Sequence, residues 1–262
     1  ELFDQKTALD KLKQLATMQQ ENEALKGRIE AIEAERSNWK QIVETFSKQG
    51  EETTEPQLKA HMLYSAAERT YKNHKRGKEI PGLLERALEA DPSHLGAAKL
   101  VERVYKERER FADLAALYMK LAENRKSKSE KVQMLLAAGY TYGRKLEDMD
   151  SAALCYSEVL DFVPGESTAL KFLVKYYEEK EDWDHLVSVY EDALHGTLAA
   201  DEEMAMLMQV GMIHWRTRGK PEAAEAYFRR LRKLAPAHPG MLGFYRKTLG
   251  ESGDKAKLLQ IL

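Results

Sequence analysis

Three prolines, Pro92, Pro164 and Pro236, are equally spaced in the sequence, and the large apolar residues between them keep the same interval, which we call the repeat period. The aligned side chains are Trp39 with Phe111 and Trp183, Ile42 with Leu114 and Leu186, Phe46 with Tyr118 and Tyr190, and Leu84 with Tyr156 and Phe228. A long period in sequence of helical type is typical of a solenoid, in which each unit buries its apolar face against its neighbours. The repeat period therefore restricts the fold to a linear array of similar units.

Each unit contains four segments with the apolar spacing of helices. In the second copy we expect the fourth helix from about Asp150 to Phe162, with Pro164 ending it. Helices of ~12–17 residues joined by short turns pack as antiparallel pairs, so a unit consists of two pairs. Gly139 and Gly211 stand in mid-helix, where glycine costs roughly 1 kcal/mol relative to alanine. We therefore expect a neighbouring helix to cross closely at both glycines.

Two stretches share an order of small, aromatic, alanine, aromatic and terminal proline residues. Residues 137–164 read AAGYTYGRKLEDMDSAALCYSEVLDFVP, and residues 209–236 read QVGMIHWRTRGKPEAAEAYFRRLRKLAP. Residues 107–121 (ERERFADLAALYMKL) and 176–194 (YYEEKEDWDHLVSVYEDAL) look like a divergent alternate repeat of the same kind. In these stretches the chain resembles the tetratricopeptide repeat family, and the alternation is similar to that of large bacterial members.

The resemblance covers residues 21–262, divided into double repeats 21–92, 93–164 and 165–236 and a partial repeat 237–262. It implies an all-α, right-handed superhelical solenoid of antiparallel helix pairs. It also implies a concave face that binds peptides or other protein domains, and no catalysis.

Composition gives no reason to expect nucleic acid or an anionic membrane as partner, because the net charge is only -2 with 32% charged residues. A single cysteine, Cys155, excludes an internal disulfide framework and suits a reducing compartment. No apolar run approaches the ~18–20 residues of a membrane span. We expect a cytoplasmic segment of a longer, bacterial protein.

The N-terminal residues 1–20 are expected to form a protruding helix, because apolar residues continue upstream of the first repeat at Leu9, Leu12, Leu15 and Met18. A heptad reading places Asn22 at a core position, where a lone asparagine favours two-stranded coiled coils. One interpretation is a coiled-coil arm that makes a homodimer. The other is a first helix that only caps the array.

Catalytic motifs are absent: the sequence has no glycine-rich phosphate loop, no nucleophile elbow and no cysteine–histidine cluster with metal spacing. The seven histidines are scattered without ligand spacing. We predict a protein that is not an enzyme and has neither cofactor nor metal.

The family resemblance also implies which side chains face the concave groove. These are Tyr64, Lys99, Arg103, Lys106, Tyr140, Arg144, Lys171, Lys175, Met208, Met212, Trp215, Arg216 and Lys247. Because Arg103, Lys175 and Lys247 recur at the repeat period in a nearly neutral chain, they suggest an acidic ligand segment held by charge. The alternative is an ordinary solvated helix face. Similarly, the stripe of Met204, Met208 and Met212 is either core or an adaptable binding surface.

Charge is uneven along the chain: residues 210–247 hold nine Lys/Arg and two Asp/Glu, whereas residues 178–203 hold ten Asp/Glu and one lysine. Head-to-tail self-association is one interpretation, and RNA binding is another, which lacks a recognisable module. The prediction is a non-catalytic protein–protein interaction scaffold that binds an acidic or extended partner segment. The alternative is a structural self-assembly module that acts through the N-terminal helix.

Overall fold

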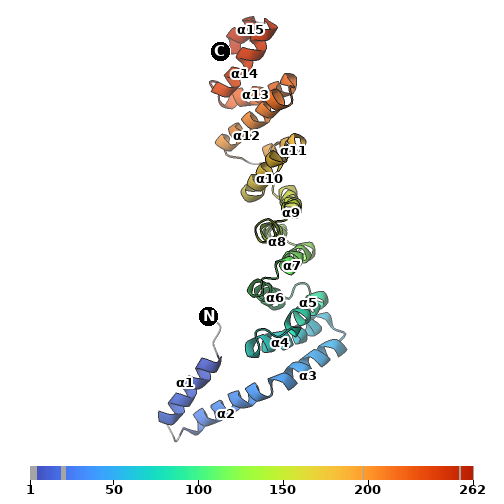
Figure 1. The fold of residues 1–262 in the computed structure, drawn as a ribbon, viewed down its shortest axis with the longest axis vertical. Coiled ribbons are helices and arrows are strands. Elements are labelled where there is room, and N and C mark those ends of the chain that lie inside the picture. The colour runs from blue at the N-terminus through green and yellow to red at the C-terminus, as the bar shows by residue number, and fades with distance from the viewer. Residues whose placement is uncertain (1–4, 19–21, 197, 254, 262) are drawn as a thin grey trace. The chain divides into compact units, whose positions relative to one another are not determined.

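The computed structural model describes residues 5–18, 22–196, 198–253 and 255–261, and within these ranges it contains helices and no strand. The chain divides into two compact units, unit 1 (Glu1–Arg110) and unit 2 (Phe111–Leu262). Unit 1 contains α1 (Gln5–Met18), α2 (Glu23–Ser37), α3 (Trp39–Glu52), α4 (Pro56–Asn73), α5 (Glu79–Ala90) and α6 (Leu95–Glu107). Unit 2 contains α7 (Phe111–Asn124), α8 (Lys128–Thr141), η1 (Tyr142–Leu146), α9 (Met149–Phe162), α10 (Ser167–Glu179), α11 (Trp183–Leu194), α12 (Ala200–Met212), η2 (Ile213–Thr217), α13 (Pro221–Leu234), α14 (Pro239–Ser252) and α15 (Lys255–Ile261) (Figure 1).

The predicted all-α array of helix pairs is confirmed. By repeat position, α4, α6, α8, α10, α12 and α14 are the first helices of the pairs, and the helix after each, or after its π-helical turn η1 or η2, is the second helix. The three equally spaced prolines each lie two positions beyond a second helix, after Ala90, Phe162 and Leu234. Proline there stops the helix, because it lacks the N–H that another turn would need.

Two kinds of turn alternate between the helices of successive pairs. After α6 and α10, Glu109 and Glu181 have a positive φ of 55° and 54°. After η1 and η2, the positive φ belongs to Glu147 (55°) and Gly219 (62°). Glu109 and Glu181 are one repeat period apart, and so are Glu147 and Gly219. The backbone conformation of the turns therefore repeats with the same period as the sequence.

The two mid-helix glycines lie against aromatic rings. A Cβ at Gly139 would be 2.9 Å from the ring of Tyr156, and one at Gly211 would be 2.7 Å from the ring of Phe228. Both rings belong to the second helix of the same pair, α9 and α13, and both are buried. The close approach expected from the sequence is therefore present, but a ring fills the space rather than a helix backbone.

The start of unit 1 departs from the predicted arrangement. The repeat predicts that α2 and α3 fold into an antiparallel pair, but they follow one another in line (Figure 1). Asn38 N donates to Ala34 O (3.0 Å) at the end of α2, and Ile42 N donates to Asn38 O (3.1 Å) at the start of α3, so Asn38 alone separates the two helices. Because no positive-φ residue occurs there, the chain does not reverse.

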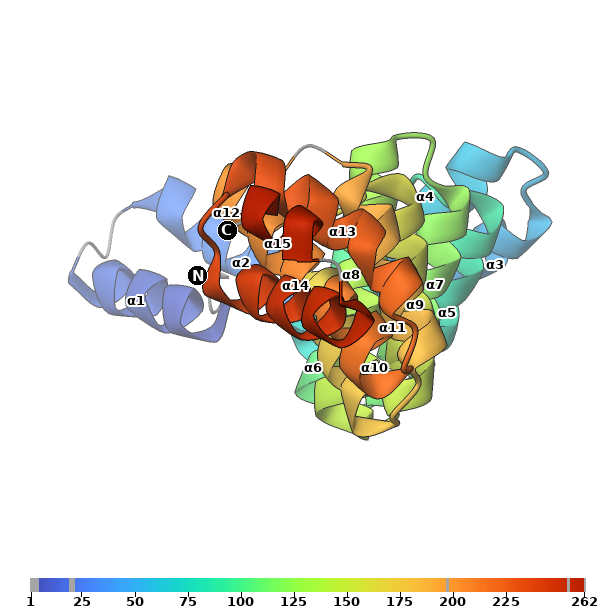
Figure 2. The ribbon, with the colours of Figure 1, turned by 90° about the horizontal axis from the view of Figure 1, so that it is seen from above.

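Helix α1 packs beside α2, as Figure 2 also shows, with Leu9 buried and Lys13 Nζ 2.6 Å from Glu33 Oε1. Asn22 accepts a hydrogen bond from Leu25 N (3.1 Å). Asn22 therefore caps α2 instead of occupying a core position of a continuous heptad. Of the expected arm, residues 1–4, 19 and 20 lie outside the described residues, and the coiled coil stays a prediction.

Candidate protein-binding surface

The basic residues assigned to the groove of unit 2 are exposed on its first helices. Lys171 and Lys175 lie one turn apart on α10, and Lys247 lies on α14. Lys175 Nζ is 3.5 Å from Glu179 Oε1, but both side chains are largely exposed, so this pair contributes little. These ammonium groups are therefore accessible to a ligand.

Unit 1 presents a comparable group on α6, where Lys99, Arg103 and Lys106 are exposed. Lys106 Nζ is already 2.6 Å from Glu102 Oε1. Burial and hydrogen bonding to Glu107 raise the pKa of the neighbouring Tyr71, and the charge of Arg103 acts in the opposite direction. Arg103 thus lies close to a tyrosine–carboxylate pair rather than in an isolated basic patch.

Tyr64 and Met208 occupy equivalent places, and both contact the next first helix. A Cβ at Gly96 would be 3.0 Å from Tyr64 Cζ, and one at Gly240 would collide with Met208 Cε. The Tyr64 ring also lies 4.9 Å from the imidazole of His94, centroid to centroid. Both residues are partly covered by packing between successive first helices.

Met204, Met212 and Trp215 are likewise partly buried against the core of unit 2. The Trp215 ring meets Phe244 edge-on at 5.3 Å, and the Arg216 guanidinium lies over the Trp215 ring at 4.6 Å. These contacts favour the packing interpretation of the methionine stripe. Tyr140 is different, because 55% of it is exposed, and Arg144 at the next turn is exposed as well.

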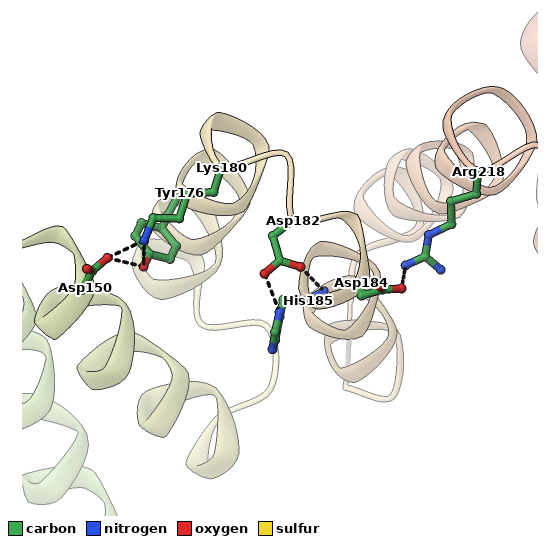
Figure 3. A network of polar contacts seen from close by, with 7 residues as sticks. All are labelled: Asp150, Tyr176, Lys180, Asp182, Asp184, His185 and Arg218. Carbon is green, nitrogen blue, oxygen red and sulfur yellow. Dashed lines mark hydrogen bonds and ion pairs between the residues drawn. The ribbon is translucent and has the colours of Figure 1, made fainter.

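A polar network that sequence reasoning missed links neighbouring pairs in unit 2 (Figure 3). Asp150 on α9 accepts hydrogen bonds from Lys180 Nζ (2.6 Å) and Tyr176 Oη (2.5 Å) at the end of α10. The Lys180 hydrogen bond and charge lower the pKa of Asp150, and the carboxylate raises that of Lys180. The only sequence signal is that Lys180 follows Arg108 by one repeat period, and Arg108 donates to the carbonyls of Lys75 and Gly77.

Ion pairs between pairs of helices continue along unit 2. Arg218 pairs with Asp184 of the preceding helix pair, as Figure 3 shows, and within the α12–α13 pair Arg230 Nη2 lies 2.6 Å from Glu203 Oε1. Arg229 pairs with Glu225 within α13 at 3.4 Å. Several charges of the acidic and basic stretches thus neutralise one another inside the unit. The uneven charge therefore gives a weaker electrostatic driving force for head-to-tail association or RNA binding.

The described residues contain no cluster of His, Cys, Asp and Glu able to hold a metal ion. Burial raises the pKa of the Cys155 thiol to about 11, which disfavours the reactive thiolate. In the part of the chain that the structure describes, no helix is long and apolar enough to cross a membrane.

No family model matches the sequence, and no curated protein matches it. Similar solved structures include YrrB, a tetratricopeptide repeat protein with an unusual peptide-binding site (16% identity over 77% of this chain and 97% of that chain, TM-score 0.35). Another is the C-terminal part of a tetratricopeptide repeat-containing protein from Cytophaga hutchinsonii (12% identity, 92% and 94% coverage, TM-score 0.36). A third is a tetratricopeptide repeat protein from Parabacteroides merdae (12%, 92% and 91%, TM-score 0.30).

The three structures carry the name of the tetratricopeptide repeat family. The helix pairs described above are the all-α array that the sequence predicts.

Proposed function

We propose that the chain is a non-catalytic scaffold whose first helices bind an acidic segment of a partner protein. The observation that carries the proposal is the exposure of Lys175 and Lys247, which recur at the repeat period on first helices of unit 2. The exposed Tyr140 and Arg144 add an aromatic face and a further cation. We place the centre of the surface on unit 2, where Lys171 and Lys175 lie side by side on α10.

The electrostatics imply a ligand with several carboxylates. An exposed ion pair contributes about 0.2–1 kcal/mol, so one contact cannot hold a partner and several must act together. Exposed charges are also screened by salt, with a Debye length of about 10 Å at 0.1 M. We therefore expect modest affinity, fast association and a steep decrease of binding with ionic strength.

The test uses a fluorescein-labelled peptide of Asp and Glu with one aromatic residue, and a matched peptide carrying Asn and Gln instead. Fluorescence anisotropy should show binding of the acidic peptide only, and Lys171→Glu/Lys175→Glu should weaken it at least tenfold. The control is Lys126→Glu/Lys233→Glu, which changes the net charge equally at exposed positions outside the first helices. Equal losses in both variants, or binding of the neutral peptide, would contradict a specific acidic site.

Self-assembly through the N-terminal helix is the second candidate, because Leu15 and Met18 on α1 are 47% and 82% exposed. If α1 makes a dimer, Leu15→Glu/Met18→Glu should halve the mass measured by light scattering. An unchanged mass would remove this candidate.

A further inference from the structure

Helix α3 has an apolar face that its own chain covers only in part. Trp39, Ile42 and Phe46 are half-buried, and among the described side chains of α3 no large apolar one is fully buried. The equivalents of Ile42 are Leu114 and Leu186, which are 2% and 0% exposed. The two equivalents of Phe46 are Tyr118 and Tyr190, at 5% and 8%.

Helix α2 carries the apolar residues that would complete this face. Leu25, Ile29 and Ile32 align with positions of α6 that are buried, whereas all three are half-buried on α2. The aligned residues of α6 are Ala97, Val101 and Val104. Both faces have the same length, from Leu25 to Ile32 and from Trp39 to Phe46, which corresponds to about 10 Å of helix.

The backbone at the junction prevents α2 from covering the α3 of its own chain. Position 37 is equivalent to Glu181, whose left-handed conformation reverses the chain between α10 and α11, and to Glu109, which has the same conformation. At position 37 the backbone stays helical instead, and only Asn38 separates the end of α2 from the start of α3, so the two helices follow one another in line (Figure 1). Residues 23–52 therefore form a nearly continuous rod with two matching apolar faces, one on each side of Asn38.

We propose that these faces are covered by a second copy of this chain, through exchange of α2. Two rods placed antiparallel about a two-fold axis near Asn38 set the α2 of each copy on the α3 of the other. Such an interface is self-complementary, as two-fold dimers require, and it reuses a contact that the repeat already encodes. Helix α1 packs on α2 with Leu9 buried, so it has to move aside where the α3 of the second copy docks, and this dimer does not use the exposed side chains of Leu15 and Met18.

The first test is the mass of the whole chain by sedimentation at micromolar concentration, with variants at the hinge. Ser37→Gly introduces the residue that most readily adopts the left-handed conformation of a reversing turn, and Ser37→Ala favours the straight helix. Since the dimer contains two such hinges, its dissociation constant should be about 20-fold higher for the glycine variant than for the alanine variant. Ile42→Glu should give a folded monomer, with helical content checked by circular dichroism.

The second test cross-links α2 to α3. In the α10–α11 pair, the rings of Tyr177 and His185 stack at 5.2 Å, and the equivalent positions are Glu33 and Gln41. Within one straight rod these two positions are about 12 Å apart along the axis. A short bifunctional thiol reagent should therefore join Glu33→Cys/Gln41→Cys chains into covalent dimers, while Cys155 stays buried.

Covalent dimers on denaturing gels, together with the hinge effect, support the exchange. A cross-link between positions 33 and 41 of the same chain would show that α2 and α3 fold into an antiparallel pair within one monomer, and this result would overturn the exchange. A monomeric wild-type chain, or a dimer lost only in Leu15→Glu/Met18→Glu, would also overturn it. The peptide-binding proposal rests on unit 2 and is tested separately by the Lys171→Glu/Lys175→Glu variant.

Discussion

Replacing Gly211 by alanine should destabilise unit 2, although alanine is the better helix former. The new Cβ would lie 2.7 Å from Cε1 and Cζ of Phe228, closer than carbon atoms approach without strain. The ring is fully buried, and on another side it packs against Phe244 at 4.5 Å between centroids. Phe228 therefore has little space into which it could move.

The magnitude follows from two opposing effects. Forcing an extra methyl group into a packed core costs about 1–3 kcal/mol, and exchanging glycine for alanine in a helix gains about 1 kcal/mol. Because the contact is so short, we expect a net loss of about 1–2 kcal/mol. In a Phe228→Leu background the clash is removed, so the same alanine should stabilise by up to about 1 kcal/mol. The coupling between the two positions is then about 2–3 kcal/mol.

Unit 1 already contains the compensated pair, since Ala67 and Leu84 stand at the equivalent positions and both are fully buried. Urea unfolding of the four proteins of the cycle, with hydrogen exchange of the α12 and α13 amides as a local probe, measures the coupling. Gly243→Ala is the matched control, because no atom lies within 4 Å of its added Cβ. If Gly211→Ala stabilises as much as Gly243→Ala in both backgrounds, the steric argument is wrong.

Three further outcomes are expected. Burial lowers the pKa of His214, with the Arg218 charge adding to the effect, so the folded state resists protonation. Stability should therefore fall as pH decreases below 6.5, the ordinary histidine value, and urea midpoints of a His214→Gln variant should change less. Glu147→Gly should raise the unfolding free energy by up to about 1 kcal/mol, and Gly219→Ala should lower it by a similar amount, because both positions have a positive φ. The buried Cys155 thiol should react with a disulfide reagent at pH 7.5 only after unfolding; fast reaction of the native protein would contradict its raised pKa.

The repeat could be predicted from the sequence because it depends on the size and order of buried side chains. Gly139 and Gly211 identified the close contacts, and the prolines identified the ends of the second helices. These features have local steric causes, so they can be interpreted from the sequence without knowing which helices pack against one another.

The straight junction between α2 and α3 could not be predicted, because the apolar spacing of both helices matches the repeat. Whether α2 and α3 run straight on or fold into a pair depends on one residue, which adopts either a helical or a left-handed conformation. That conformation in turn depends on what covers the apolar faces of α2 and α3. Helix spacing alone does not contain this information.

The candidate surface was only partly predictable. The family resemblance predicted groove-facing residues, and of these Lys171, Lys175 and Lys247 are exposed on first helices. Tyr64 and Met208 instead lie between successive first helices. Glycines on the following helix, Gly96 and Gly240, make room for these two side chains. Gly96 follows Tyr64 by the same number of residues as Gly240 follows Met208. This regularity is present in the sequence, but only the packing of the side chains shows that it marks a contact.

The alternation of turn types limits how such a chain can grow. A pair whose first helix ends like α10 is followed by a pair whose first helix ends like η2, and contacts between the two, such as Arg218 with Asp184, join unlike pairs. Deleting or duplicating a single pair would set two like pairs side by side and remove these partners. Gene duplication or protein engineering would therefore lengthen the array in steps of two pairs, because only then do the two kinds of pair keep alternating.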